Sequence, residues 1–190
     1  MRKVIYHAQT TVDGRIAKRG GELWEPFPWG ETEIAFVNEF FRATDTWVLG
    51  RQMHDVIVPW WSKVAAGDPP EQAGDLDAAS LEFARIFGGL RIAVFSHTLD
   101  DDPGRTVLRG APAEQLAALK REDGRDIMLS CGPALLGQVA SLVDEYLLAV
   151  SPVVLGGGKR IFDDLQRDIP LRLAQARVFG GGAVVLRYQA

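Results

Sequence analysis

Three short segments of this sequence combine residue types that bind phosphate groups, and each directly follows a strand-like run. They are Arg51, the Ser96-His97-Thr98 run and the Cys131-Gly132-Pro133 run. A guanidinium and hydroxyls bind phosphate oxygens, and a helix N-terminus offers unpaired N–H groups and a positive dipole end. The carboxyl ends of parallel strands lie at one edge of a sheet, where α/β proteins bind ligands. The three segments therefore predict a site for a phosphate-rich ligand.

Each segment also has an interpretation without a ligand. Arg51 could be a surface charge, Ser96 and Thr98 ordinary turn residues, and His97 a solvated side chain. Gly132-Pro133 suits any helix start, since proline loses nothing by lacking an N–H there. Cys131 could be a reactive thiol at a helix N-terminus, although a small apolar filler is the more common role. The glycine spacings of Rossmann and Walker loops are absent from the sequence.

The elements that must position these residues alternate between short apolar runs and longer helical ones. Strand-like runs occur at 4–9, 46–50, 91–96, 106–110, 126–130 and 145–156. Helical spacing is seen at 32–43, 111–123 and 133–143, and the polar stretch 62–79 predicts a loop with a short helix. Two runs around Gly180-Gly181-Gly182 predict a hairpin. The pattern indicates a three-layer α/β fold with a mostly parallel mixed sheet and a C-terminal antiparallel hairpin.

Composition excludes several other classes of protein. With 190 residues and 47% hydrophobic content, the chain can form one core, so we expect a single domain over 1–190. A net charge of −4 disfavours nucleic acid and anionic membranes as partners. The single cysteine allows no internal disulfide, and His7 and His54 have no ligand-spaced partners, so we expect no metal. No apolar run is long enough to span a bilayer or to form a signal-peptide core, which indicates a cytoplasmic protein.

Six segments, in order, resemble those of a known superfamily. The segments are AQTTVDGRIA (8–17), LGR (49–51), VFSHTL (94–99), DIMLSCGPALL (126–136), VDEYL (143–147) and PVVLGGGKRIF (152–162). The chain resembles the dihydrofolate reductase-like superfamily. It is most similar to the reductase domain of riboflavin-biosynthesis enzymes (the RibD C-terminal-like family) and to their stand-alone relatives.

The resemblance implies NADPH as the cofactor and assigns residues to it. Ala8 and Ile16 would frame the nicotinamide, and Gly50 and Arg51 would reach phosphate. Ser96, His97 and Thr98 would surround the ribose with its 2′-phosphate. The turn and helix start would cradle the pyrophosphate through Cys131, Gly132, Pro133, Ala134, Leu135 and Leu136.

Three positions depart from the pattern of the relatives. Cys131 stands where they often have the first residue of a double glycine. Met53 stands where they usually have threonine, so one hydroxyl contact to phosphate is lost or replaced. His97 stands where the riboflavin-type relatives commonly have arginine. A neutral imidazole selects a 2′-phosphate less strongly than a guanidinium does, which keeps NADH as an alternative cofactor.

A reductase of this kind also needs a proton donor and a substrate pocket. Asp13 and Glu33 are the candidate acids, against the alternatives of Asp-Gly turn chemistry and a helix N-terminal acid. All five tryptophans lie between residues 24 and 61. Aromatic walls suit a flat heterocycle, whereas a dimer interface or an ordinary core would use the same residues. The predicted pocket residues are Trp24, Phe27, Trp29, Phe36, Val37 and Trp60 or Trp61.

The leading hypothesis is an NADPH-dependent reductase that transfers hydride to a pteridine-like, pyrimidine-like or related small heterocyclic substrate. One alternative is a stand-alone riboflavin-pathway 5-amino-6-(5-phosphoribosylamino)uracil reductase. Another is a non-catalytic nucleotide-binding protein, which Met53 and Cys131 favour. The resemblance also implies a homodimer, to which the apolar run 145–155 could contribute a sheet edge.

Overall fold

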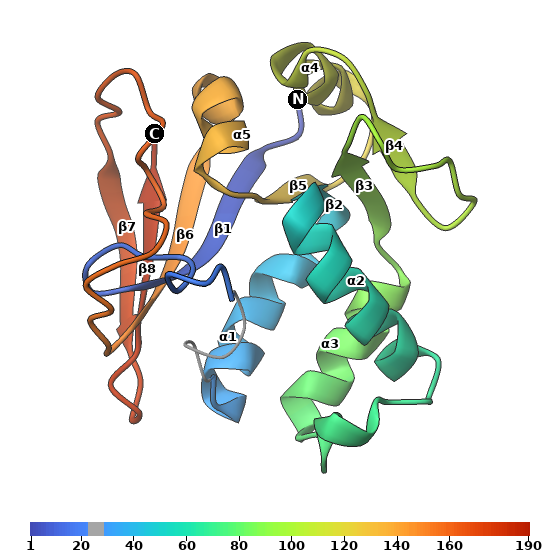
Figure 1. Ribbon diagram of the computed structural model, residues 1–190, viewed down its shortest axis with the longest axis vertical. Helices are drawn as coiled ribbons and strands as arrows, with labels where there is room; N and C mark the ends of the chain where they lie inside the picture. Colours follow the sequence, from blue (N-terminus) through green and yellow to red (C-terminus); the bar gives the residue numbers. More distant parts are fainter. Residues whose placement is uncertain (23–28) are drawn as a thin grey trace.

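The computed structural model describes residues 1–22 and 29–190 (Figure 1). Its strands are β1 (Val4–Thr11), β2 (Thr44–Gly50), β3 (Arg91–Phe95), β4 (Thr106–Leu108), β5 (Asp126–Ser130), β6 (Glu145–Ser151), β7 (Arg172–Val178) and β8 (Val184–Gln189). Its α-helices are α1 (Glu31–Arg42), α2 (Arg51–Ala65), α3 (Ala78–Gly88), α4 (Pro112–Arg121) and α5 (Pro133–Val139). Two 3₁₀ turns, η1 (Glu71–Ala73) and η2 (Ala140–Leu142), complete the set.

The strands form one eight-stranded sheet in the order β4-β3-β2-β5-β1-β6-β8-β7. All pairs from β4 to β6 are parallel, and β8 pairs with β6 and β7 in antiparallel fashion. The predicted mostly parallel sheet with a C-terminal antiparallel hairpin is confirmed. Because the parallel strands share a direction, the residues that follow β1, β2, β3 and β5 all lie at one edge of the sheet.

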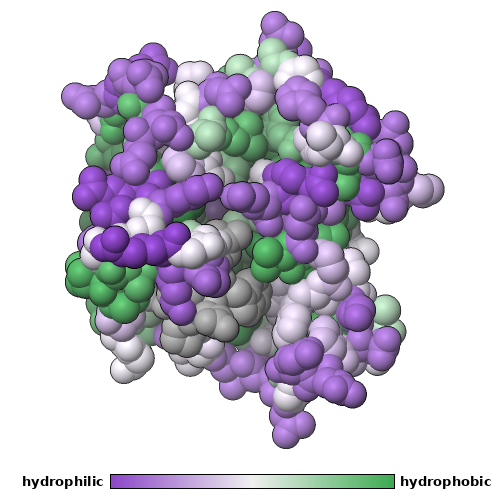
Figure 2. Space-filling model, viewed as in Figure 1, coloured by the Kyte–Doolittle hydropathy of each residue, from purple (hydrophilic) through white to green (hydrophobic). Residues whose placement is uncertain are grey.

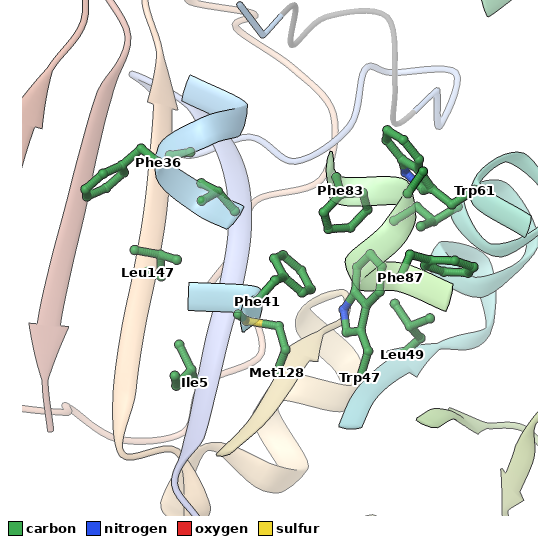
Figure 3. Close-up of a cluster of buried hydrophobic side chains, with 14 of the residues drawn as sticks. Ile5, Phe36, Phe41, Trp47, Leu49, Trp61, Phe83, Phe87, Met128 and Leu147 are labelled. Carbon is green, nitrogen blue, oxygen red and sulfur yellow. The ribbon is translucent and has the colours of Figure 1, made fainter. Parts of the chain in front are cut away.

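Side chains alternate along the strands and so build a core on each face of the sheet. On one face, Ile5 of β1 and Trp47 of β2 pack in a cluster that includes Phe41 of α1 and Phe83 of α3 (Figure 3). On the other face, Tyr6 of β1 belongs to a cluster with side chains of α4 and α5. The sheet is therefore the middle layer of the predicted three.

Helices α2 and α3 lie mostly where the sequence analysis predicted no regular element. The loop with a short helix predicted at 62–79 corresponds to residues 66–77, which contain η1. In α2, Met53, Ile57 and Trp61 recur at helical spacing and pack toward the core, while Pro59 lies on the exposed side. Proline inside a helix removes a hydrogen bond, so tertiary packing must offset that loss. The start of α3 is fixed by Asp77, whose carboxylate accepts the Ser80 N–H at 2.7 Å. Among the described residues, no helix combines the length and apolar character of a membrane span.

The prediction that the apolar run 145–155 provides a sheet edge was wrong. Its strand, β6, lies between β1 and β8, because its uninterrupted apolar side chains are buried on both faces. The edges are β4 and β7, and every residue of β7 is exposed. In the view of Figure 2, apolar surface shows at the left side, over β7 and β8, below a hydrophilic band.

Candidate active site

The side chains that follow β2 and β3 meet at the carboxyl edge of the sheet, as their positions in the sequence predict. Arg51 is the first residue of α2, and its Nη1 lies 3.2 Å from Thr98 Oγ1 and 3.4 Å from Ser96 Oγ. Its Nε donates to Asp55 Oδ2 at 2.6 Å, which holds the guanidinium in place. His97 is exposed to solvent. The result is a group of one cation and two hydroxyls that can bind an anion.

The turn from β5 into α5 lies against the turn from β2 into α2. A Cβ placed on Gly50 would stand 3.4 Å from Cys131 Cβ and 3.8 Å from Leu135 Cδ2, so the two turns are in direct contact. At Gly132, by contrast, a Cβ would meet nothing within 4 Å, so the backbone there is open to a ligand. This contact brings the start of α5 close to Arg51.

The first turn of α5 leaves backbone N–H groups free to bind an anion. Pro133 has none, and the first residues of any helix have no intrahelical acceptor, which applies to Ala134 and Leu135. Leu136 differs, because its N–H donates to the Gly132 carbonyl at 3.1 Å and its side chain is fully buried in the core. The structure thus places Leu136 behind the predicted cradle and not on its surface.

The thiol of Cys131 is buried, and burial raises its pKa far above the ordinary value. A thiol with a raised pKa is a poor nucleophile. The carbonyl of Cys131 accepts the Tyr6 hydroxyl at 2.9 Å, which fixes the turn. These facts favour the interpretation of Cys131 as a small apolar residue that fills space over its interpretation as a reactive thiol.

A cavity of about 560 Å³ lies beside this edge, between the sheet and helices α1, α2 and α3. Its aromatic wall consists of Trp29, Phe41, Trp47, Trp60, Trp61 and Phe83. Ala8, Ile16 and Cys131 line it as well, so it reaches the position predicted for the nicotinamide. A cavity of this size with aromatic walls fits a small flat ring.

The predicted pocket residues have three different outcomes. Trp29, Val37, Trp60 and Trp61 line the cavity. Phe36 lies on the other side of α1, where its ring packs 5.8 Å from the Phe179 ring (centroid to centroid), and in Figure 3 it points away from Trp61 and Phe83. Trp24 and Phe27 lie outside the described residues.

Several polar residues in the cavity wall were missed in the sequence analysis, and the hydrogen bonding of two of them, His7 and Asn38, bears on the site. Each has a buried atom without a hydrogen-bond partner among the described residues, Nε2 of His7 and Oδ1 of Asn38. Burial lowers the pKa of His7 to about 4, so its imidazole is neutral at ordinary pH. The signal for Asn38 was available: it stands four residues after Ile34, on the apolar face of a helix.

Asp13 links the loop that follows β1 to the loop that follows β6. Its carboxylate accepts the Thr11 hydroxyl at 2.6 Å and the N–H groups of Leu155 and Gly156 at 3.2 and 2.9 Å. These hydrogen bonds, led by that from Thr11, hold the pKa of Asp13 far below its usual range. A carboxylate that stays ionised is a poor proton donor, so the geometry favours the turn interpretation of Asp13.

Glu33 lies in the first turn of α1, where its carboxylate accepts the Thr32 hydroxyl at 2.8 Å. The side chain is buried, and a Cβ on Gly181 would stand 3.6 Å from its Oε1, which places it near the turn between β7 and β8. Neither Glu33 nor Asp13 lines the cavity as far as the described residues define it. This position favours the helix N-terminal interpretation of Glu33.

The hydrogen bonds of Asp13 predict an acid-sensitive stability. Because the folded-state pKa lies below the unfolded value of about 3.9, this carboxylate stabilises the fold fully above about pH 5 and progressively less as the pH falls. We expect Asp13→Asn to melt at a lower temperature at pH 7 and to lose less stability between pH 5 and pH 3 than the wild type. Thermal unfolding followed by circular dichroism measures both, with the exposed Asp68→Asn as the control. An unchanged acid slope in Asp13→Asn would contradict the assignment.

No three His, Cys, Asp or Glu side chains of residues 1–22 and 29–190 come together as a metal site requires. The candidate site therefore consists of the anion-binding group at the sheet edge and the aromatic cavity beside it.

The strand order and the position of this site define an α/β domain of the dihydrofolate reductase-like fold. The chain belongs to the RibD C-terminal domain family, whose model matches residues 2–185. The family resemblance predicted from the six segments is confirmed.

Two relatives from Bacillus subtilis (strain 168) match over nearly the whole chain. The uncharacterized protein YyaP is 28% identical, covering 98% of this chain and 94% of its own length. The uncharacterized protein YwjB is 29% identical, and the match covers 98% of this chain and 97% of YwjB.

Solved structures share the fold at low sequence identity. One is a diaminohydroxyphosphoribosylaminopyrimidine deaminase/5-amino-6-(5-phosphoribosylamino)uracil reductase from Thermotoga maritima, with a TM-score of 0.70, 15% identity, and coverage of 99% of this chain and 56% of that chain. Another is a pyrimidine reductase-like protein from Corynebacterium diphtheriae, with a TM-score of 0.65 and 16% identity. The match covers 99% of this chain and 91% of that chain. At such identities the likeness concerns the fold alone.

Proposed function

We propose that this protein is an NADPH-dependent reductase that transfers hydride to a small pteridine-like, pyrimidine-like or related heterocycle. The observation that carries the proposal is the contact between an anion-binding sheet edge and an aromatic cavity. Membership of a family of reductase domains supports the same reaction type.

The residues present fit NADPH. Arg51, Ser96 and Thr98 provide a cation and hydroxyls for phosphate, and Gly132 leaves the backbone open before the free amides of α5. Ala8 and Ile16, in the cavity wall, would adjoin the nicotinamide, which supplies the hydride when bound. The tryptophans of the cavity would orient a flat ring and exclude water.

The proton that accompanies the hydride is a separate question. Asp13 and Glu33 stay predictions for this role, with their surroundings favouring structural functions. The titratable groups in the described cavity wall are His7, Asp75, Asp77 and Cys131, whose buried thiol has a raised pKa.

We also propose that the protein forms a homodimer. Since β6 is interior, pairing between two copies through a sheet edge would use β7 or β4. The exposed Leu173 and Val178 of β7 would contribute apolar surface to such a contact.

Cofactor titration followed by turnover tests the proposed function. We expect saturable NADPH binding with quenching of tryptophan fluorescence, because Trp29, Trp47 and Trp60 line the cavity that the nicotinamide adjoins. We then expect NADPH oxidation with at least one pteridine or pyrimidine of a screened series. NADH, titrated in parallel, reports the selectivity for the 2′-phosphate. Binding without turnover would support the non-catalytic alternative, and no binding of either cofactor would refute the proposal.

A further inference from the structure

Positive charge is distributed unevenly around the site. Arg51 lies at the sheet edge, and Lys159 lies near it, with its Nζ 3.5 Å from Gln52 Oε1 at the start of α2. No lysine or arginine occurs among the described residues that line the cavity. Within the described residues, Arg51 and Lys159 thus lie beside the sheet edge that would bind the cofactor phosphates, and no cation lines the cavity.

The ionisable groups of the described cavity wall provide no positive charge to attract an anion at ordinary pH. Asp75 and Asp77 contribute carboxylates, and His7 is neutral at ordinary pH. A phosphate or carboxylate placed among apolar walls would lose hydration without gaining a counter-charge, and it would be repelled by the two aspartates. The cavity therefore disfavours anionic substrates.

Asn38 indicates which chemical group a ligand in the cavity must carry. Its Nδ2 donates to the Ala79 carbonyl at 2.9 Å, and since a carbonyl can only accept, the orientation of the amide is fixed. The other amide atom, Oδ1, is a buried acceptor that has no partner among residues 1–22 and 29–190, and its side chain lines the cavity. A buried acceptor without a partner is costly, and a ligand N–H or O–H would satisfy it.

We infer that the substrate is an uncharged flat ring that carries an N–H or O–H donor and no phosphate, and that Asn38 is a specificity-determining residue that accepts a hydrogen bond from it. This inference rests on the proposed reductase function and deepens it. It separates the protein from an enzyme that acts on a ribosylaminopyrimidine phosphate.

A matched pair of ring compounds tests the requirement for an uncharged ligand. The probes are 6-hydroxymethylpterin and its monophosphate, which differ only in the phosphate, titrated calorimetrically into the protein with and without NADP⁺. We expect the neutral compound to bind at least tenfold more tightly. Equal or tighter binding of the phosphate would overturn the inference and leave the reductase proposal standing. Binding of neither compound would also overturn it, because the cavity is required to admit a neutral ring of this size.

Charge reversal at the cavity provides the matched control. Asp75→Lys places a cation in the cavity wall on an exposed residue, so we expect it to bind the monophosphate at least fivefold more tightly than the wild type does. Asp68→Lys makes the same change on an exposed residue outside the wall, and we expect no effect on the pair at physiological salt. An equal gain in both variants would contradict a local electrostatic cause.

Asn38→Leu tests the acceptor. We expect the affinity for 6-hydroxymethylpterin to fall about tenfold, because a ring donor then has no partner in the cavity. Unchanged affinity in a folded variant would overturn the role of Asn38. If the variant does not fold, the phosphate pair and Asp75→Lys still decide the substrate class. Failure of the NADPH titration is a different result, which refutes the proposed function and not the selectivity of the cavity.

Discussion

Replacing Arg51 by methionine is expected to weaken NADPH binding by about 10- to 100-fold, with a much smaller effect on NADH. The guanidinium is the cation of the group that includes Ser96 and Thr98, and a hydrogen bond to a charged partner contributes about 1.5–3 kcal/mol. Arg51 contacts Ser96 and Thr98, which the family resemblance assigns to the ribose with its 2′-phosphate. NADH lacks that phosphate, so its affinity is expected to change little when the cation is removed. Parallel fluorescence titrations with both cofactors measure the change in selectivity.

The control for this experiment is Arg42→Met. Arg42 is also an exposed arginine in an ion pair, with its Nη2 2.5 Å from Glu82 Oε1, but it lies at the end of α1. Exposed pairs contribute at most about 1 kcal/mol to stability, so both variants should fold. An Arg51→Met protein with unchanged NADPH affinity would show that the sheet edge does not bind the phosphate.

The second large effect is expected in the pH dependence of stability and is due to His7. Burial lowers the pKa of His7 from 6.5 to about 4 in the folded protein. Between these values the unfolded chain binds a proton that the folded protein does not, so stability falls as the pH is lowered through this window. The full shift corresponds to a loss of at most about 3 kcal/mol, at about 1.4 kcal/mol per pKa unit.

Urea unfolding at pH 7, 6, 5 and 4.5 measures the effect. We expect His7→Gln to lack most of this loss, since glutamine does not titrate in the window. His97→Gln, on an exposed histidine, should keep the slope of the wild type. A wild-type slope in the His7 variant would mean that water reaches the imidazole freely and leaves its pKa near the ordinary value.

The sequence by itself determined the architecture and the meeting of the strand ends. Alternating apolar runs predicted a parallel sheet, and in such a sheet the residues after each strand share one edge. For that reason the proximity of Arg51, Ser96 and Thr98 could be predicted before their contacts were seen. The six segments predicted the RibD C-terminal family by their resemblance to its motifs, and the family model that matches residues 2–185 confirms it.

Helices α2 and α3 could not be predicted in the same way. Pro59 and the polar stretch after it weaken the local signal, and the packing of Trp61 against Phe83, with ring centroids 4.6 Å apart, offsets that weakness. Such packing depends on two segments that the sequence separates by about twenty residues. Local propensity alone does not contain it.

Only the tertiary structure decided the chemistry of the cavity. His7 and Asn38 became candidates because the part of the chain that the structure describes leaves Nε2 and Oδ1 buried without partners, which no spacing in the sequence reveals. Asp13 lost support as an acid because its carboxylate accepts hydrogen bonds from Thr11 and from Leu155 and Gly156, the last two being far away in the sequence. Burial and hydrogen bonding depend on what the rest of the chain places around a side chain, so residue type and spacing predicted where the site lies, and tertiary packing determined which of its atoms are free to act.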